Sequence, residues 1–282
     1  MIMSSSISKK TWHEKILITV KTYPHPSQKY DELVCTAGIR EDGSWVRLYP
    51  VRFRHMSYAK QYEKYDWIDV EVEKNDTKDP RPETLRPVRT SEGEENMHTT
   101  SHWGTEEGWL LRKTLIAKTI VPSMCALIRD CKERGTSLGT VRPASIDAFI
   151  IGKSEREWKP KWMALFEQQN LFGEDRKPLT KIPYTFSYRF GCGGTCKGHT
   201  MQITDWEIHQ LYLNCVRDAD GNEKIALEKV RHRYEKEFLP KRDIHFFMGT
   251  TLEHQKKNAP NPFLITGVFY PPKDPNLAML LE

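Results

Sequence analysis

Residues 32–54, ELVCTAGIREDGSWVRLYPVRFR, decide the fold of the N-terminal part of the chain. Two runs rich in apolar and aromatic residues, 33–40 and 45–49, flank the dipeptide Asp42-Gly43. An Asp-Gly pair between such runs is a strong hairpin signal, because glycine tolerates the positive φ angle that a tight turn needs. The stretch therefore predicts two antiparallel strands joined by a short turn.

The residues on either side extend this hairpin into a sheet. Residues 16–20 (ILITV) have the composition of a strand, and Pro24 and Pro26 bar its continuation because proline cannot donate a ladder hydrogen bond. Residues 66–75 (DWIDVEVEKN) alternate apolar and acidic side chains, as a strand with one solvated face does. We therefore expect a twisted sheet or small β-barrel over residues 13–90.

The rest of the chain mixes helical and strand patterns. The segment 91–170 is expected to be mainly helical. It begins with the polar residues 91–105, which are expected to form a connecting loop. Residues 171–282 predict an α+β part that ends in a hairpin formed by 244–252 and 263–270. The expected fold class is thus α+β, with three successive parts.

Composition limits the function classes. The 43 basic residues are nearly matched by 38 acidic ones, for a formal net charge of +5, which permits a nucleic-acid partner without requiring one. No apolar run is long enough to cross a bilayer, and residues 1–10 do not have the pattern of a signal peptide. Six cysteines without an export signal favour thiols or metal ligands over disulfides. We expect a cytoplasmic protein with no membrane partner.

The stretch at residues 190–207, FGCGGTCKGHTMQITDWE, carries a candidate metal site. Its glycine-rich turn allows Cys192, Cys196 and His199 to converge, and Zn²⁺ favours four ligands drawn from cysteine and histidine. Cys215 is the predicted fourth ligand, with His209, Cys35 and His102 as alternatives. The alternative to a zinc site is a turn in which the two cysteines only fill space.

Two acids at the end of the same stretch have two interpretations. Thr204 and Glu207 have the spacing of a capping box, and Asp205 suits the first turn of a helix. If only three ligands hold the metal, Asp205 and Glu207 become candidate catalytic groups beside a metal-bound water. The sequence leaves open whether the protein is an enzyme.

A second candidate surface interleaves rings with arginines. Small barrels that bind single strands use aromatic rings to stack on bases and arginines to meet phosphates. The alternative is that the rings belong to the core. The candidate nucleic-acid-binding residues are Trp45, Arg47, Tyr49, Arg52, Phe53 and Arg54.

These patterns lead to one expected function and two alternatives. The first is a protein that binds RNA or DNA and contains a structural zinc site. The second is a metal-dependent hydrolase, for example a nuclease, that uses the Cys/His/Asp/Glu cluster. The third is a protein-interaction module. The sequence indicates neither the substrate nor the oligomeric state.

Overall fold

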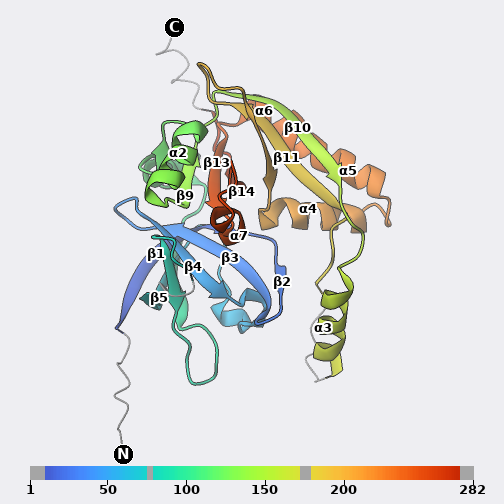
Figure 1. Cartoon of the computed structure of the whole chain (residues 1–282). Helices are drawn as coiled ribbons and strands as arrows, with labels where there is room; N and C mark the ends of the chain where they lie inside the picture. The colour runs from blue at the N-terminus through green and yellow to red at the C-terminus, as the bar shows by residue number, and fades with distance from the viewer. Residues whose placement is uncertain (1–9, 75–78, 172–178, 274–282) are drawn as a thin grey trace, which may run out of the picture.

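The computed structural model describes residues 10–74, 79–171 and 179–273, with side chains omitted at 167–171. It has two sheets, one in each half of the chain, with the barrel half (blue to teal) below the C-terminal half (green to red) in Figure 1. No helix in these ranges is both long and apolar enough to span a bilayer. The predicted α+β class is confirmed.

The N-terminal sheet closes into a five-stranded barrel. Its strand order is β1-β3-β4-β6-β5, and β5 pairs back onto β1 to close the ring. The β4–β6 pair is parallel and the other pairs are antiparallel. The predicted hairpin is the β3–β4 pair. The barrel strands are β1 (Thr11–Lys21), β3 (Asp31–Ile39), β4 (Trp45–Val51), β5 (Asp66–Lys74) and β6 (Thr84–Pro87).

Four short elements decorate the barrel. Strand β2 (His25–Ser27) pairs with β3, and strand β7 (Met97–His102) pairs with β5. Strand β7 lies where the polar sequence predicted only a connecting loop. The strand carries no alternation of apolar and polar side chains that could reveal it, because Met97 is buried and the five residues that follow are exposed. Two single-turn helices, η1 (Phe53–His55) and η2 (Tyr58–Lys60), join β4 to β5.

The C-terminal sheet has the order β10-β11-β12-β14-β13-β9-β8. The predicted terminal hairpin is confirmed, because β13 and β14 pair antiparallel. Its strands are β8 (Ile120–Val121), β9 (Leu138–Val141), β10 (Ser145–Lys153), β11 (Tyr184–Gly191), β12 (His199–Ile203), β13 (His245–Thr250) and β14 (Phe263–Phe269).

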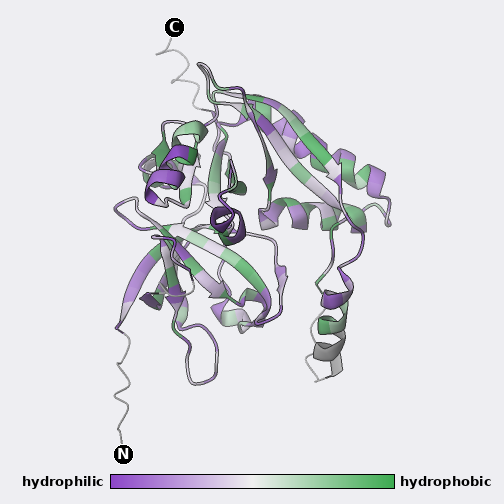
Figure 2. Ribbon diagram, in the orientation of Figure 1, coloured by the Kyte–Doolittle hydropathy of each residue, from purple (hydrophilic) through white to green (hydrophobic). Residues whose placement is uncertain are grey.

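Three helices, α2, α4 and α5, pack in the core of the C-terminal half. In Figure 1, α2 lies beside β9 and β13, whereas α4 and α5 lie behind β10 and β11 and α3 extends away from both sheets. Figure 2 shows the short helix α7 as hydrophilic, consistent with its lack of buried residues. The helices are α1 (Glu106–Ala117), α2 (Met124–Arg134), α3 (Pro160–Leu171), α4 (Trp206–Arg217), α5 (Glu223–Arg231), a π-helical turn η3 (His232–Glu237), α6 (Phe238–Lys241) and α7 (Leu252–Lys256).

Three apolar clusters hold the molecule together. One fills the barrel, one fills the C-terminal half, and the third joins the two halves. In the third, Ile39 and Trp67 on the outside of the barrel share a cluster with Leu138 and Phe247 of the C-terminal sheet. The outer face of the barrel is therefore an internal surface at this point.

Candidate metal centre and interdomain cleft

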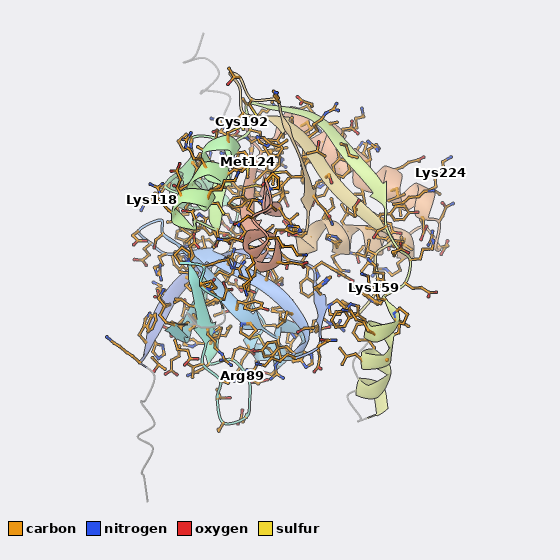
Figure 3. All side chains as sticks on the ribbon, viewed as in Figure 1. Arg89, Lys118, Met124, Lys159, Cys192 and Lys224 are labelled. Carbon is orange, nitrogen blue, oxygen red and sulfur yellow. The ribbon has the colours of Figure 1, made fainter. Side chains whose placement is uncertain are left out.

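Four metal-ligating side chains converge at one end of the C-terminal sheet. Cys192 and Cys196 lie in the turn between β11 and β12, and His199 is the first residue of β12. Cys125, the second residue of α2, joins them from a distant part of the sequence. Figure 3 labels Cys192 close to Met124, the neighbour of Cys125. One ligand atom from each lies within 4.8 Å of all the others.

Three distances within this Cys₃His cluster match the edges of a coordination tetrahedron. Bonds of about 2.3 Å from Zn to sulfur and about 2.0 Å to nitrogen imply edges of about 3.8 Å between sulfurs and about 3.5 Å between sulfur and nitrogen. The Cys125 and Cys196 sulfurs are 3.7 Å apart, and His199 Nε2 lies 3.5 Å and 3.4 Å from them. The Cys192 sulfur lies within 4.8 Å of the other three ligand atoms, so the four groups together can hold a metal ion.

The glycine-rich turn supplies both the shape and the polarity of the cluster. Gly193, Gly194 and Gly198 have positive φ angles, which side-chain-bearing residues rarely adopt. The Gly198 N–H donates to the Cys196 sulfur at 3.3 Å. A backbone hydrogen bond at Cys192, together with this one at Gly198, lowers the pKa of the Cys196 thiol, which favours the thiolate that a metal needs. Burial lowers the pKa of His199, which favours the neutral imidazole.

The fourth member of the cluster differs from the predicted one. Cys215 lies on α4 in the C-terminal core and is 8% exposed, whereas Cys125 completes the cluster. Of the other candidates, the buried His209 bonds through Nδ1 to the Asp205 carbonyl oxygen. Cys125 was not among the predicted ligands, because nothing in the local sequence indicates that the start of α2 packs against a turn 71 residues further on.

A cavity of about 570 Å³ lies between the barrel and the C-terminal half. The barrel contributes the end of β1 and residues 63–65, and α1 and α4 form the opposite sides. We call this cavity the interdomain cleft. Its lining residues are Lys21, Glu63, Lys64, Tyr65, Thr105, Trp109, Arg112, Trp206, Glu207, Gln210, Leu211, Asn214 and Tyr270.

A buried ion-pair network forms the floor of the cleft. Lys64 Nζ lies 2.9 Å from Asp205 Oδ2 and 3.2 Å from Glu207 Oε2. Burial acts to lower the pKa of Lys64, but the charges of Asp205 and Glu207 outweigh it and the pKa is raised. Asp205 is fully buried, while the Glu207 side chain is 38% exposed. Only one of the two acids can therefore meet a ligand.

Two cations of the cleft lie against aromatic rings. The Arg112 guanidinium is 3.7 Å from the centre of the Tyr65 ring and 5.1 Å from that of Trp109. Lys21 Nζ is 5.0 Å from the centre of the Trp206 ring. Burial lowers the pKa of both cations. The cleft thus presents positive charge and π surface side by side.

Comparison with known protein families divides the chain between these two halves. Residues 120–282 match a domain of unknown function, DUF8757, and residues 12–118 match a second domain of unknown function, DUF8758. The chain belongs to the DUF8757 family. Neither the curated proteins nor the solved structures contain a match to it. The Cys₃His cluster lies within the DUF8757 region, and the interdomain cleft takes residues from both matched regions.

The predicted catalytic acids lie at the start of α4 in the DUF8757 region. The helix cap is Asp205, whose side chain accepts a hydrogen bond from the Glu207 N–H, and not Thr204 as the capping-box spacing predicted. Thr204 instead bonds through its N–H and hydroxyl to the Ile265 carbonyl oxygen, because it continues the pairing of β12 with β14. Neither acid belongs to the Cys₃His cluster.

The predicted nucleic-acid-binding residues are divided between the core and the surface. Arg47 is fully buried and donates to Ser137 Oγ and to the Ser137 carbonyl oxygen in the DUF8757 region. The Trp45 ring packs against Phe247 of the same region. Phe53 is buried in the barrel, and Tyr49, Arg52 and Arg54 are partly exposed. The structure therefore does not bring the six residues together on one surface.

Proposed function

We propose that this protein binds nucleic acid and that one structural zinc ion holds its C-terminal half together. Proteins that bind single strands combine aromatic rings, on which bases stack, with cations that meet phosphates. The interdomain cleft has both: Lys21 lies over the Trp206 ring, and the Trp109 ring lines the same cavity beside the buried Arg112 guanidinium. This pairing within one cavity is the observation that carries the proposal.

The barrel gives a second, weaker line of support. OB-folds are five-stranded barrels that bind oligonucleotides on the face of their second and third strands. Likeness of architecture is an argument by analogy and does not identify a site. The corresponding strands here are β3 and β4, and Trp45 on this face packs against Phe247 of the C-terminal sheet. We therefore assign the binding role to the cleft beside the barrel and not to this covered face.

The proposed metal is zinc. Three thiolates and one imidazole are a ligand set that zinc takes in structural sites, and four protein ligands leave no open coordination position. The site would tie α2 to the β11–β12 turn, which supports a structural role. We do not propose metal-assisted hydrolysis, since the cluster contains neither Asp205 nor Glu207.

Metal analysis of the purified protein tests the zinc proposal. We expect about one zinc per chain in the wild type and well below that in Cys125→Ser and Cys196→Ser variants. Cys35→Ser is the matched control, because Cys35 lies in β3 outside the cluster and should leave the zinc content unchanged. Absence of metal from protein prepared without chelators would refute the proposal, as would a full equivalent in Cys125→Ser.

Titration of labelled single-stranded RNA and DNA at several salt concentrations tests nucleic-acid binding. Lys21→Gln should reduce the log–log salt slope by about 0.7 if this lysine meets a phosphate. Trp109→Leu should cost about 1–3 kcal/mol of affinity if its ring stacks on a base. Both variants are to be checked by thermal melting, because a folding defect would also lower affinity.

Two exposed residues outside the cleft provide matched controls. Lys224→Gln on α5 removes one positive charge from an exposed residue that does not line the cleft, and Tyr58→Ala on η2 removes a ring that is 93% exposed. Neither should change the affinity by more than about twofold. If no oligonucleotide binds at low salt, or if the controls weaken binding as much as the cleft variants do, the proposal is wrong.

A further inference from the structure

Backbone strain in bulky residues coincides with the interdomain cleft. Tyr65 has a φ angle of 71° and Trp109 one of 69°, and both line the cavity. A positive φ is unusual for any residue except glycine and is a clear outlier for a large aromatic one. Such strain persists where surrounding contacts enforce it, and it gathers at ligand sites. Trp109 belongs to a run of three residues, 107–109, that have positive φ where α1 is kinked, and both strained residues contribute their rings to the cleft.

Arg112 fixes the position of these strained rings. Its Nε donates to the Trp103 carbonyl oxygen at 2.8 Å, and Nη2 donates to the same atom. The guanidinium lies 3.7 Å from the centre of the Tyr65 ring, and the Tyr65 and Trp109 rings meet edge to face at 6.5 Å. Tyr65 and Arg112 are themselves buried, so a flat ligand would stack on the partly exposed Trp109 ring, which they hold in place.

The opposite side of the cleft presents hydrogen-bonding groups in a row. Glu207, Gln210 and Asn214 lie on one face of α4, at helical spacing, and all three line the cavity. Within the described ranges, Lys64 is the one hydrogen-bonding or ion-pairing partner of the Glu207 carboxylate, and it contacts Oε2. The other carboxylate oxygen is an acceptor that a ligand can use.

The charges of the cleft restrict the ligand further. Glu207 and Glu63 would repel an anion placed directly against them, so a free phosphate is a poor occupant. Lys21 and Arg112 favour negative charge or π surface nearby. The matching ligand has a flat ring with N–H donors at one edge and an anionic group at the other. A nucleotide has this arrangement.

We propose that the interdomain cleft holds one unstacked nucleobase, with guanine preferred, whose ring lies on Trp109 and whose N–H edge donates to Glu207. This assignment rests on the proposed nucleic-acid binding, which it makes specific. Guanine is preferred because its ring N–H and its amino group are adjacent donors that the carboxylate can accept together. Oε1 accepts one of them, and Oε2 accepts the other through its second lone pair, beside its contact with Lys64. Adenine and cytosine offer the amino group without an adjacent ring N–H. The cavity of about 570 Å³ has the size of a small-molecule site.

Mononucleotide titrations followed by tryptophan fluorescence and calorimetry test this assignment. GMP should bind about tenfold more tightly than IMP, which lacks the amino group, and more tightly than AMP or UMP. Glu207→Gln replaces one acceptor oxygen by a donor, so this preference should fall to about twofold or less. Glu253→Gln is the matched control, because it makes the same change on the exposed helix α7 outside the cleft, and it should keep the preference for GMP over IMP.

The outcomes separate this inference from the proposed function. Equal binding of the four nucleotides, or unchanged selectivity in folded Glu207→Gln, overturns the guanine assignment even if oligonucleotides bind through Lys21 and Trp109. Selective binding of GMP without binding of any oligonucleotide supports the base site and rejects polymer binding. Failure of every nucleotide and oligonucleotide to bind rejects both. Thermal melting of each variant ensures that a lost signal reports the site and not unfolding.

Discussion

The Lys64 ammonium lies 2.9 Å from a carboxylate oxygen of Asp205, a residue 141 positions later in the chain. The same Asp205 oxygen accepts from the Val268 N–H at 3.0 Å, and the other oxygen accepts from the Glu207 N–H at 3.2 Å. Both partners of this ion pair are buried. One carboxylate thus joins the barrel to α4 and to β14, and it holds Glu207 at the edge of the interdomain cleft.

Asp205→Asn should be strongly destabilising. The substitution removes the main counter-charge of the buried Lys64 and replaces an acceptor by a donor that faces the ammonium group. Breaking a buried ion pair by removing one partner typically costs about 3–5 kcal/mol. Urea denaturation of the wild type and the variant at neutral pH measures the difference. A loss below about 1 kcal/mol would show that the pair contributes little to holding the two halves together.

Glu207→Gln should leave stability unchanged or slightly higher at pH 7. Burial raises the pKa of the Glu207 carboxyl above its ordinary value, although Lys64 opposes the shift. A carboxyl with a raised pKa binds its proton more tightly in the folded state, so its contribution to stability is lost as the pH rises through that pKa. The ionised carboxylate therefore destabilises the folded state at pH 7, and a neutral glutamine removes this destabilisation. Thermal melts at pH 5 and pH 7 check it, and a loss as large as that of Asp205→Asn would contradict it.

The start of α4 shows how far local sequence can determine a site. The stretch ITDWE predicts a helix start, and a helix does begin at Trp206. Thr204 and Asp205 are both good N-cap residues, so local preference cannot choose between them. The choice depends on Ile265 and Lys64, which bond to Thr204 and Asp205 from distant parts of the chain. Element types were therefore predictable here, whereas the role of each side chain was not.

The same limit applies to Arg47 and Cys125. The β3–β4 hairpin follows from its turn and its apolar runs, but the partner that permits burial of Arg47 is Ser137, 90 residues away. Three members of the metal cluster are close in sequence and were found. The fourth depends on how α2 packs. Sequence patterns report local geometry, and both of these features are set by tertiary contacts.

Removal of the metal should loosen α2 and the β11–β12 turn before the rest of the molecule. The ligands of a structural zinc are brought together by folding, so metal binding stabilises the folded state and chelation withdraws that stabilisation. Treatment with a strong chelator should lower the melting temperature of the wild type, with little effect on metal-depleted Cys196→Ser. Hydrogen exchange should rise first at residues 124–134 and 191–199. Uniform exchange across the barrel and the C-terminal half would contradict a local structural role.

Glu223→Gln should destabilise the protein at neutral pH but not at strongly acidic pH. Arg156 donates to both Glu223 oxygens at 3.0 Å and 2.7 Å, and the Tyr184 hydroxyl donates at 2.8 Å. These bonds lower the pKa of Glu223 to about 2. Because its pKa is lowered in the folded state, the Glu223 carboxylate stabilises the fold above its ordinary pKa near 4.5. This stabilisation is lost as the pH falls toward 2.

Melting curves of the wild type and Glu223→Gln should therefore converge between pH 4.5 and pH 2. Glu253→Gln is the control, because Glu253 pairs with Lys257 on the exposed surface and its removal should have a smaller effect at neutral pH. A constant difference between Glu223→Gln and the wild type at all pH values would mean that packing, and not charge, determines the effect.

The paired substitution Arg52→Gln and Arg54→Gln decides whether the barrel surface or the cleft binds nucleic acid. Arg52 Nη2 donates to the Gly93 carbonyl oxygen at 2.8 Å, and Arg54 Nη1 lies 3.0 Å from a Glu32 oxygen. A phosphate would have to compete with these internal partners, of which the Glu32 carboxylate carries a negative charge, whereas Lys21 Nζ donates to the uncharged Tyr62 carbonyl oxygen at 3.2 Å. We therefore expect the double variant to keep the wild-type affinity within about twofold and to keep its salt slope. If both arginines meet phosphates, the slope should instead shrink by about 0.7–0.9 for each lost contact. Salt titrations of the double variant beside Lys21→Gln separate the two cases, because only one of the two proteins should show the reduced slope.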